Sequence, residues 1–331
     1  MRILVTGGCG FIGSNFILRC FEKFENFSII NLDAMVIGSN PLNLKELKSS
    51  KYKFVRGNIC NKTLLEKLIP KVDHIVNFAA ESHVDRSIVN PKDFIKSNYL
   101  GVFNILEVLR NHKKIKLLHI STDEVYGEIL KGKHVENDEM NPSNPYSATK
   151  ASAEMIIRAY SRTYDLDTTI TRATNNFGPR QFLEKLIPST ILSALRNETM
   201  QLHGNGSYKR QWIYVNDHCE ALVKILKNWK SSSIYNIAGN NEVTNLNIVK
   251  KIMKIMNKNN LISFGPDRPG QDRRYSISGN LLEKRTGFRA KTNLDDALKH
   301  TIEWYVSNRK WWEKISLQKI NPTPWLKNRQ L

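Results

Sequence analysis

A glycine-rich turn directly after the first hydrophobic segment constrains the fold of this chain more than any other feature. The segment from Thr6 to Gly13 reads Thr-Gly-Gly-Cys-Gly-Phe-Ile-Gly and follows Ile-Leu-Val. Gly8, Gly10 and Gly13 fit the spacing GxGxxG, and Gly7, Gly10 and Gly13 fit GxxGxxG. Glycine suits such a turn because the backbone must bend tightly, approach a pyrophosphate and let a helix pack on the strand. The turn therefore predicts a dinucleotide site at the start of a helix, where free N–H groups favour phosphate.

An acidic residue at the end of the second hydrophobic segment indicates which dinucleotide binds. Asp33 follows Ile29–Leu32 and lies twenty residues after Gly13. A carboxylate in this position binds ribose hydroxyls and repels a 2′-phosphate. We therefore predict NAD as the cofactor and not NADP.

Short β-branched runs alternate with helical patterns through the first half of the chain. This alternation is typical of βαβ units and predicts an α/β fold, a Rossmann-type doubly wound parallel sheet. We expect an NAD-binding domain over residues 1–178, with a return segment near 211–238, and a smaller, interleaved substrate-binding lobe over 179–331. The expected strands are Ile3–Val5, Ile29–Leu32, Tyr52–Val55, Ile75–Phe78, Ile115–Ile120 and Thr168–Arg172, and the expected helices include Ile12–Phe24, Ser97–Asn111 and one beginning near Tyr146.

Composition narrows the class of protein. The chain has 331 residues, with 50 Lys and Arg against 31 Asp and Glu, so its formal net charge is +19. The basic residues are scattered, and no long basic run predicts a nucleic-acid site; salt-dependent binding of random duplex would support that alternative. No apolar run is long enough to span a membrane, and no secretory signal is expected at the start. We predict a cytoplasmic protein without a metal site, because the cysteines have no CxxC spacing: Cys9, Cys20, Cys60 and Cys219.

Tyr146 and Lys150 form the first candidate catalytic pair. They are four residues apart, which places them on one face of a helix. A nearby ammonium favours the phenolate and lowers the pKa of a tyrosine from near 10. Such a tyrosine serves as a general base on a sugar hydroxyl. The alternative is an exposed helical pair with no catalytic part.

The segment Ser121-Thr122-Asp123-Glu124 carries the second candidate group. It begins at the end of an expected strand, where ligands bind in open α/β sheets. Two adjacent carboxyl groups can divide acid and base roles if their surroundings separate their pKa values. The alternative is a pair of solvated loop acids.

Together these segments resemble the nucleotide-sugar 4,6-dehydratases, a group within the extended short-chain dehydrogenase/reductase family. The resemblance extends over nearly the whole chain. The further segments that carry it are Ala79–Ser87, Thr174–Pro179, Glu184–Pro188, Arg210–His218 and Arg268–Tyr275.

The resemblance implies a mechanism. Tyr146, assisted by Lys150, is expected to take the proton of the glucose 4-hydroxyl while hydride passes from C4 to tightly bound NAD. Glu124 then removes the C5 proton and Asp123 protonates the departing 6-hydroxyl. Hydride returns to C6, which gives a 4-keto-6-deoxy sugar for deoxysugar biosynthesis and regenerates NAD. Thr122 is expected to donate a hydrogen bond to the 4-oxygen and polarise the ketone.

The resemblance also implies two sets of binding residues. The cofactor set is Gly7, Gly10, Phe11, Ile12, Gly13, Asp33, Asn58, Ile59, Ala79, Ala80, Ser121, Tyr146, Lys150 and Asn176. The substrate set is Ser82, His83, Thr122, Asn175, Lys185, Leu186, Arg210, Asn245 and Arg273. Arg210 and Arg273 suit a diphosphate because a guanidinium binds phosphate oxygens in pairs. The alternative to substrate contact by His83 is that this residue orients a loop. For Asp85 and Arg86, which lie in the same segment, the alternative is an ion pair with each other.

Several positions depart from the family pattern. Asn58 replaces an Asp that contacts adenine, and Arg180, Leu183 and Gln271 replace a Tyr, a Pro and a His near the nucleotide. Because three of these positions lie near the nucleotide, the sequence leaves open whether the substrate carries thymidine or uridine. We expect dTDP-glucose as the substrate, with UDP-glucose as the alternative.

Two other functions are compatible with parts of the same motifs. A UDP-hexose 4-epimerase shares the glycine turn and the Tyr–Lys pair but needs no acid pair, so Asp123 and Glu124 distinguish the two. A dinucleotide-binding protein without turnover is the non-enzyme alternative.

We expect a homodimer on the resemblance alone. Core packing or a dimer contact is expected for Trp304, Trp311, Trp312 and Trp325.

Overall fold

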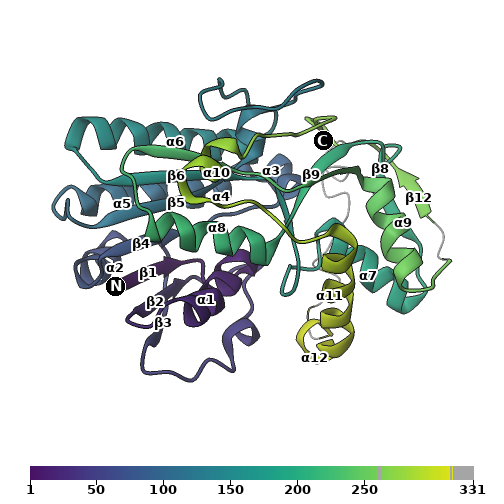
Figure 1. Ribbon diagram of the computed structural model, residues 1–331, viewed down its shortest axis with the longest axis horizontal. Coiled ribbons are helices and arrows are strands. Elements are labelled where there is room, and N and C mark those ends of the chain that lie inside the picture. The colour runs from purple at the N-terminus through teal and green to yellow at the C-terminus, as the bar shows by residue number, and fades with distance from the viewer. Residues whose placement is uncertain (260–261, 314, 316–331) are drawn as a thin grey trace.

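The structure of the chain, a computed structural model, describes residues 1–259, 262–313 and 315. Its centre is a seven-stranded sheet in the order β3–β2–β1–β4–β5–β6–β10 (Figure 1). Every neighbouring pair in it is parallel, so the predicted fold class is confirmed. The strands are β1 (Arg2–Thr6), β2 (Ser28–Asp33), β3 (Tyr52–Arg56), β4 (His74–Asn77), β5 (Lys116–Thr122), β6 (Thr168–Ala173) and β10 (Ser233–Ile237).

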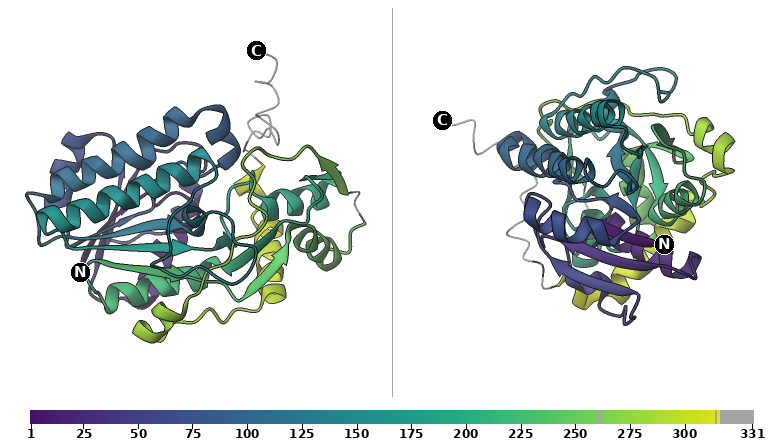
Figure 2. Two further views of the ribbon diagram at one scale, coloured as in Figure 1. Left: turned by 90° about the horizontal axis from the view of Figure 1, so that it is seen from above. Right: turned by 90° about the vertical axis from the view of Figure 1, so that its left-hand side faces the viewer.

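Two layers of helices bury the two faces of the sheet. On one face α1 (Phe11–Lys23) packs beside α8 (Val215–Lys227), and on the other α2 (Lys62–Leu68), α5 (Gly101–Leu109) and α6 (Pro145–Tyr164) lie side by side (Figure 2). Each layer has its own apolar cluster against the sheet. Because both faces are covered, the central strands are apolar runs and do not alternate.

The expected helix Ser97–Asn111 is divided in the structure. Residues Ile95–Leu100 form η3, a π-helical segment, and α5 begins only at Gly101. Two short helices, α3 (Val84–Val89) and α4 (Pro91–Phe94), precede it. A Cβ on Gly101 would lie 2.4 Å from Cδ1 of Ile59, so glycine at this position lets the helix pack closely on that side chain.

A smaller lobe sits at the carboxyl ends of the sheet strands. It contains a three-stranded sheet, β11–β9–β7, and a two-stranded sheet, β12–β8, with helices packed around them. The chain enters this lobe after β6 and returns through α8 and β10 to the large sheet. The remaining elements are β7 (Asn175–Phe177), α7 (Leu186–Arg196), β8 (Met200–His203), β9 (Lys209–Tyr214), β11 (Asn241–Thr244), α9 (Asn245–Ile255), β12 (Ile262–Gly265), α10 (Asn280–Thr286), α11 (Leu294–Ser307), α12 (Arg309–Trp312), and the short turns η1 (Pro41–Leu44), η2 (Ile69–Lys71) and η4 (Asp123–Tyr126).

The tryptophans near the C-terminus pack into the core. Trp311 and Trp312 are buried, and the ring of Trp304 meets that of Trp311 edge-on at 5.0 Å. The indole N–H of Trp311 donates to Oδ1 of Asn43 at 2.7 Å, which ties α12 to the loop after β2. These contacts agree with the core-packing interpretation. Trp325 lies outside the described residues.

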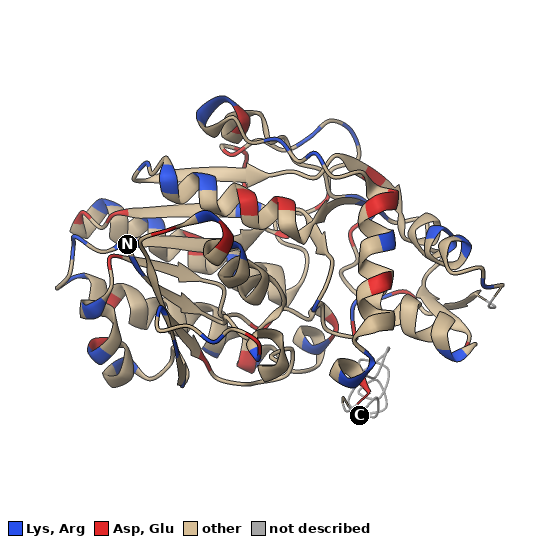
Figure 3. Cartoon of the chain, turned by 60° about the horizontal axis from the view of Figure 1, so that its bottom comes forward, with Lys and Arg blue, Asp and Glu red and all other residues tan. Residues whose placement is uncertain are grey.

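The charge of the chain is dispersed. Lys and Arg occur on most helices in view, with Asp and Glu among them (Figure 3). Among the described residues, no helix has the length and apolarity that a membrane span requires.

A buried ion pair joins α6 to the sheet. The guanidinium of Arg172 on β6 donates to the carboxylate of Glu154 on α6 at 2.7 and 2.9 Å, and Ser121 donates to the same carboxylate at 2.5 Å. Both charged side chains are at most 1% exposed. The pair thus fixes α6 against the carboxyl ends of β5 and β6.

We predict that Arg172→Met destabilises the fold by about 3–5 kcal/mol, because it leaves the Glu154 carboxylate buried without its cation. Urea denaturation at constant pH measures this. The double variant Arg172→Met with Glu154→Leu is the control and should regain most of the loss, since no charge then stays buried. A loss below about 1 kcal/mol in the single variant would contradict the prediction.

Candidate functional site

The glycine turn packs so closely that side chains cannot enter it. Gly7 has φ +72°, and a Cβ there would lie 2.7 Å from the backbone nitrogen of Ala79. A Cβ on Gly13 would lie 2.4 Å from the carbonyl oxygen of Gly7. Helix α1 starts after Gly10 without a side-chain cap, so its first N–H groups face the open carboxyl edge of the sheet. The turn lies at the carboxyl ends of the neighbouring strands β1 and β4. The chain continues from β1 to β2 and from β4 to β5, in opposite halves of the sheet, and such sheets bind ligands at this switch point.

Asp33 is held in place by its own neighbours. Its carboxylate accepts from the backbone nitrogens of Cys9 and Met35 and from the hydroxyl of Ser39, each at 2.8 Å. A carboxylate accepts about four hydrogen bonds, so one acceptor position is left for a ligand hydroxyl. The side chain lines the same cavity as the glycine turn.

The start of α6 places Tyr146 and Lys150. Asn144 caps the helix by accepting from the backbone nitrogen of Ser147, in a capping box with Pro145 at the first position. The backbone nitrogen of Tyr146 donates to Oγ of Ser87 on α3 at 3.2 Å. These caps fix the first turn of α6, so that Tyr146 and Lys150 face the carboxyl end of β5.

The acid pair opens the short turn η4 directly after β5. Thr122 caps this turn: its hydroxyl accepts from the backbone nitrogen of Glu124 at 3.3 Å and donates to Oδ1 of Asp123 at 3.3 Å. Asp123 is 2% exposed. Burial, and then the adjacent Glu124 carboxylate, raise the pKa of Asp123 to about 8. Asp123 therefore holds its proton at neutral pH, as the acid of an acid–base pair must.

The electrostatics of Tyr146 differ from the sequence-based expectation. Burial raises the pKa of Tyr146, and the Glu124 and Asp123 carboxylates raise it further, while a hydrogen bond with Thr122 lowers it. Lys150 is not among the groups that shift the pKa of Tyr146, and its ammonium donates to the carbonyl oxygen of Ile120 at 2.7 Å. The expectation of a lowered phenol pKa is therefore wrong for this arrangement. Burial also lowers the pKa of Lys150 to about 8.

Two adjoining cavities meet at these side chains. The first cavity, at the glycine turn, is lined by all but one of the predicted cofactor residues: Gly7, Gly10, Phe11, Ile12, Gly13, Asp33, Asn58, Ile59, Ala79, Ala80, Ser121, Tyr146 and Lys150. The second cavity, between the sheet and the smaller lobe, is lined by Ser82, His83, Glu124, Asn175, Lys185, Leu186, Arg210 and Asn245, together with Leu183 and Gln271. Ser82, Glu184 and Lys185 line both, so the cavities communicate.

Five residues that the sequence associates with ligands or catalysis line neither cavity: Thr122, Asp123, Asn176, Arg180 and Arg273. Asn176 lies outside the first cavity and its amide contacts Thr174 and His218. Arg273 has a side chain 65% exposed and pairs with Glu128. Arg180 lies outside the second cavity, over the ring of Trp304.

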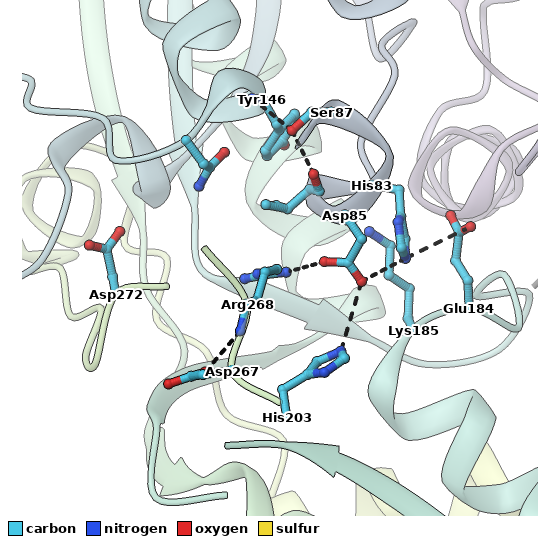
Figure 4. A network of polar contacts seen from close by, with 12 residues as sticks. His83, Asp85, Ser87, Tyr146, Glu184, Lys185, His203, Asp267, Arg268 and Asp272 are labelled. Carbon is cyan, nitrogen blue, oxygen red and sulfur yellow. Dashed lines mark hydrogen bonds and ion pairs between the residues drawn. The ribbon is translucent and has the colours of Figure 1, made fainter. Parts of the chain in front are cut away.

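A polar network around the second cavity was not foreseen from the sequence (Figure 4). The carboxylate of Asp85 accepts from the guanidinium of Arg268 at 2.8 Å. Arg86 instead contacts Glu184 at 3.2 Å and Glu81 at 3.6 Å. The alternative that Asp85 and Arg86 pair with each other is therefore wrong, because consecutive residues of α3 point to different neighbours.

No local signal could have revealed the contact between Asp85 and Arg268, because 183 positions separate the two residues in the sequence. The sequence indicates Glu184 only as a member of the segment Glu184–Pro188 and assigns it no role of its own. Its carboxyl group is buried, which raises its pKa, and it lies where the two cavities join.

Comparisons with known proteins give consistent results. The family model described as GDP-mannose 4,6 dehydratase matches residues 4–301. A dTDP-glucose 4,6-dehydratase from Streptomyces niveus is 39% identical over 321 residues, 95% of this chain and 96% of the relative. A crystal structure of the Streptomyces venezuelae dTDP-glucose 4,6-dehydratase with NAD bound has a TM-score of 0.93 and 38% identity, and covers 96% of this chain and 100% of its own.

A UDP-glucose 4-epimerase structure from Thermotoga maritima shares the fold at lower similarity. Its TM-score is 0.86 at 26% identity, over 93% of this chain and 100% of its own. Sequence identity therefore favours the dehydratases over this epimerase.

Proposed function

Since this chain belongs to the GDP-mannose 4,6-dehydratase family, we propose that it is a dTDP-glucose 4,6-dehydratase. The observation that carries the proposal is the pair of carboxyl groups of Asp123 and Glu124 beside Tyr146, one of them protonated at neutral pH. A 4-epimerase has no water to eliminate and so needs no such pair. The names of the relatives favour thymidine over uridine.

We assign NAD binding to residues 1–178 with the return segment near 211–238, and nucleotide-sugar binding mainly to 179–331. The glycine turn fits a dinucleotide, because Gly7 and Gly13 let the backbone turn tightly where side chains would clash and α1 presents uncapped N–H groups. Asp33 retains one acceptor position for a ribose hydroxyl. NAD held in this cavity would supply the hydride-transfer chemistry that the reaction needs at C4 and C6 of the sugar.

The residues of the chain carry the proton transfers. Tyr146 takes the proton of the 4-hydroxyl, and Lys150, one helical turn further along α6, assists this step. Thr122 donates to the 4-oxygen and stabilises the developing ketone. Glu124 removes the C5 proton, which the ketone has made acidic, and Asp123 gives its proton to the leaving 6-hydroxyl. The elevated pKa of Asp123 matches this last role.

The test of the function is mass spectrometry of the sugar nucleotide. Purified protein with NAD is incubated separately with dTDP-glucose and UDP-glucose. We expect the loss of one water from dTDP-glucose, giving the 4-keto-6-deoxy product, a precursor of deoxysugars such as rhamnose. Faster loss from UDP-glucose would reassign the nucleotide. An unchanged mass with galactose formed would mean an epimerase.

Two substitutions separate the steps of the reaction. Glu124→Gln should retain slow oxidation at C4, seen as a reduced-nicotinamide absorbance on mixing, while water loss falls by at least about 100-fold. Tyr146→Phe should block the oxidation itself, because no base then takes the hydroxyl proton. Normal dehydration by Glu124→Gln would overturn its role, and full hydride transfer by Tyr146→Phe would overturn that of Tyr146.

We further propose a homodimer formed through the face of η3 and α6. These elements pack against each other and expose the apolar side chains of Ile95 (49%), Leu100 (46%) and Met155 (62%). Light scattering should give twice the chain mass, and the double variant Leu100→Lys with Met155→Lys should shift it toward the monomer. A monomer mass for the parent protein would refute the proposal.

A further inference from the structure

The acid pair opens a turn whose last residue is a buried tyrosine. The turn η4 covers Asp123–Tyr126, so Tyr126 follows Glu124 by two positions. Tyr126 is 2% exposed and is not among the residues that line the two cavities. The proposed reaction gives this side chain no part. Any effect of Tyr126 on the reaction is therefore expected to pass through the turn that it ends.

Three segments distant in the sequence contact the side chain of Tyr126. The guanidinium carbon of Arg172 on β6 lies over its ring, 4.5 Å from the ring centre. The imidazole of His134 stacks on the ring, with centres 4.8 Å apart and planes at 9°. The phenol hydroxyl donates to Oδ1 of Asn236 on β10 at 2.9 Å. Burial raises the pKa of Tyr126 to about 12, so the guanidinium meets an uncharged ring, as in a cation–π contact.

The two side chains that pack on the ring are themselves fixed. Arg172 has a side chain 1% exposed, and its guanidinium also donates to the carboxylate of Glu154 on α6. His134 is held through its backbone. Its nitrogen donates to the carbonyl oxygen of Ser276 at 2.9 Å, and its carbonyl oxygen accepts from the nitrogen of Ser278 at 2.8 Å. The ring of Tyr126 is therefore attached to parts of the fold that are rigid.

One guanidinium thus contacts both elements that carry the reactive side chains. Through Glu154, Arg172 holds α6, which carries Tyr146. Through the ring of Tyr126 it holds the end of η4. The start of this turn is held separately, by the hydroxyl of Thr122. Tyr126 is the contact by which the second end of the turn is fixed relative to α6.

We propose that Tyr126 is a positioning residue for the acid pair: its anchored ring fixes the turn, and the turn fixes the carboxyl groups of Asp123 and Glu124. The proposal rests on the proposed function, because it takes this pair to remove water across C5 and C6. Tyr126 itself touches no reacting atom. Since Tyr146 lies on α6 and not on the turn, a loosened turn should slow the loss of water and spare the oxidation at C4.

The kinetic test compares Tyr126→Leu, which removes the ring, with Tyr126→Phe, which keeps it. The NAD-loaded enzyme is mixed with dTDP-glucose; the reduced-nicotinamide absorbance reports the oxidation, and mass spectrometry of quenched samples reports the loss of water. For the Leu variant we expect oxidation within about threefold of the parent but water loss about 10- to 100-fold slower, as for groups displaced by about 1 Å. Reduced nicotinamide should then accumulate. The Phe variant should resemble the parent in both steps.

A control variant separates positioning from a general loss of stability. Ile225 on α8 is 1% exposed and packs in a different apolar cluster from Tyr126. Ile225→Ala should lower the melting temperature and keep the parental ratio of the two rates. A Leu variant at position 126 that also melts lower but keeps this ratio would overturn the proposal, because Tyr126 would then act only by packing.

A second variant covers the case in which Tyr126→Leu does not fold. His134→Ala removes one of the two side chains that pack on the ring and leaves the ion pair of Arg172 with Glu154 in place. We expect the same selective loss on a smaller scale, with water loss about threefold slower and oxidation unchanged. A parental ratio of the two rates in this variant would refute the proposal.

Hydrogen–deuterium exchange gives a readout apart from activity. Two backbone N–H groups report on the turn: that of Glu124 donates to Thr122, and that of Gly127 donates to the carbonyl oxygen of Glu124. Exchange in residues 121–127 should be faster in Tyr126→Leu, or in His134→Ala if only that variant folds, than in Ile225→Ala. Equal exchange would overturn the proposal.

The failure of this inference can be distinguished from the failure of the function. If the parent removes water from dTDP-glucose but the Leu variant keeps the ratio of the two rates, only the role of Tyr126 is refuted. If the parent neither oxidises nor dehydrates a nucleotide sugar, the function is refuted, and the exchange of the turn alone decides whether Tyr126 fixes it.

Discussion

The packing of α6 against the carboxyl ends of β5 and β6 is the constraint on which the site depends. Two buried contacts hold it there: the ion pair of Arg172 with Glu154, and the hydrogen bond from Lys150 to the carbonyl oxygen of Ile120. Because α6 carries Tyr146 and β5 leads directly into Asp123, this single interface sets the distance between the base and the acid pair. A helix held less firmly would leave the proton transfers without defined geometry.

Burial at this interface gives the ionisable groups their chemical character. Desolvation is the largest influence on the pKa of Asp123, Tyr146 and Lys150, and in each case it favours the neutral form. For Asp123 this produces a proton donor at neutral pH. For Lys150 it produces a charge that is only just maintained, which is why the neighbouring Glu154 carboxylate, which raises the pKa of Lys150, matters. The same water-free surroundings strengthen every hydrogen bond to the reacting atoms.

The fold and the first cavity could be predicted because their signals are local. Alternating strands and helices, the glycines of one turn and an acid at the end of β2 all lie within short stretches of sequence, and backbone geometry converts them directly into structure. Residues such as Asp85, Arg268 and Arg273 could not be placed in this way. Which partner a long charged side chain reaches depends on how the smaller lobe sits against the sheet.

The sequence by itself determined the doubly wound sheet, the dinucleotide turn and the presence of an acid pair beside a Tyr–Lys helix, since each follows from residue type at a fixed spacing. Only the tertiary structure decided that Asp85 pairs with Arg268, that Arg273 turns outward to Glu128, and that the pKa of Tyr146 is raised. The physical reason is that desolvation and ion pairing depend on which surfaces are brought together from distant parts of the chain, and spacing along the sequence does not specify this.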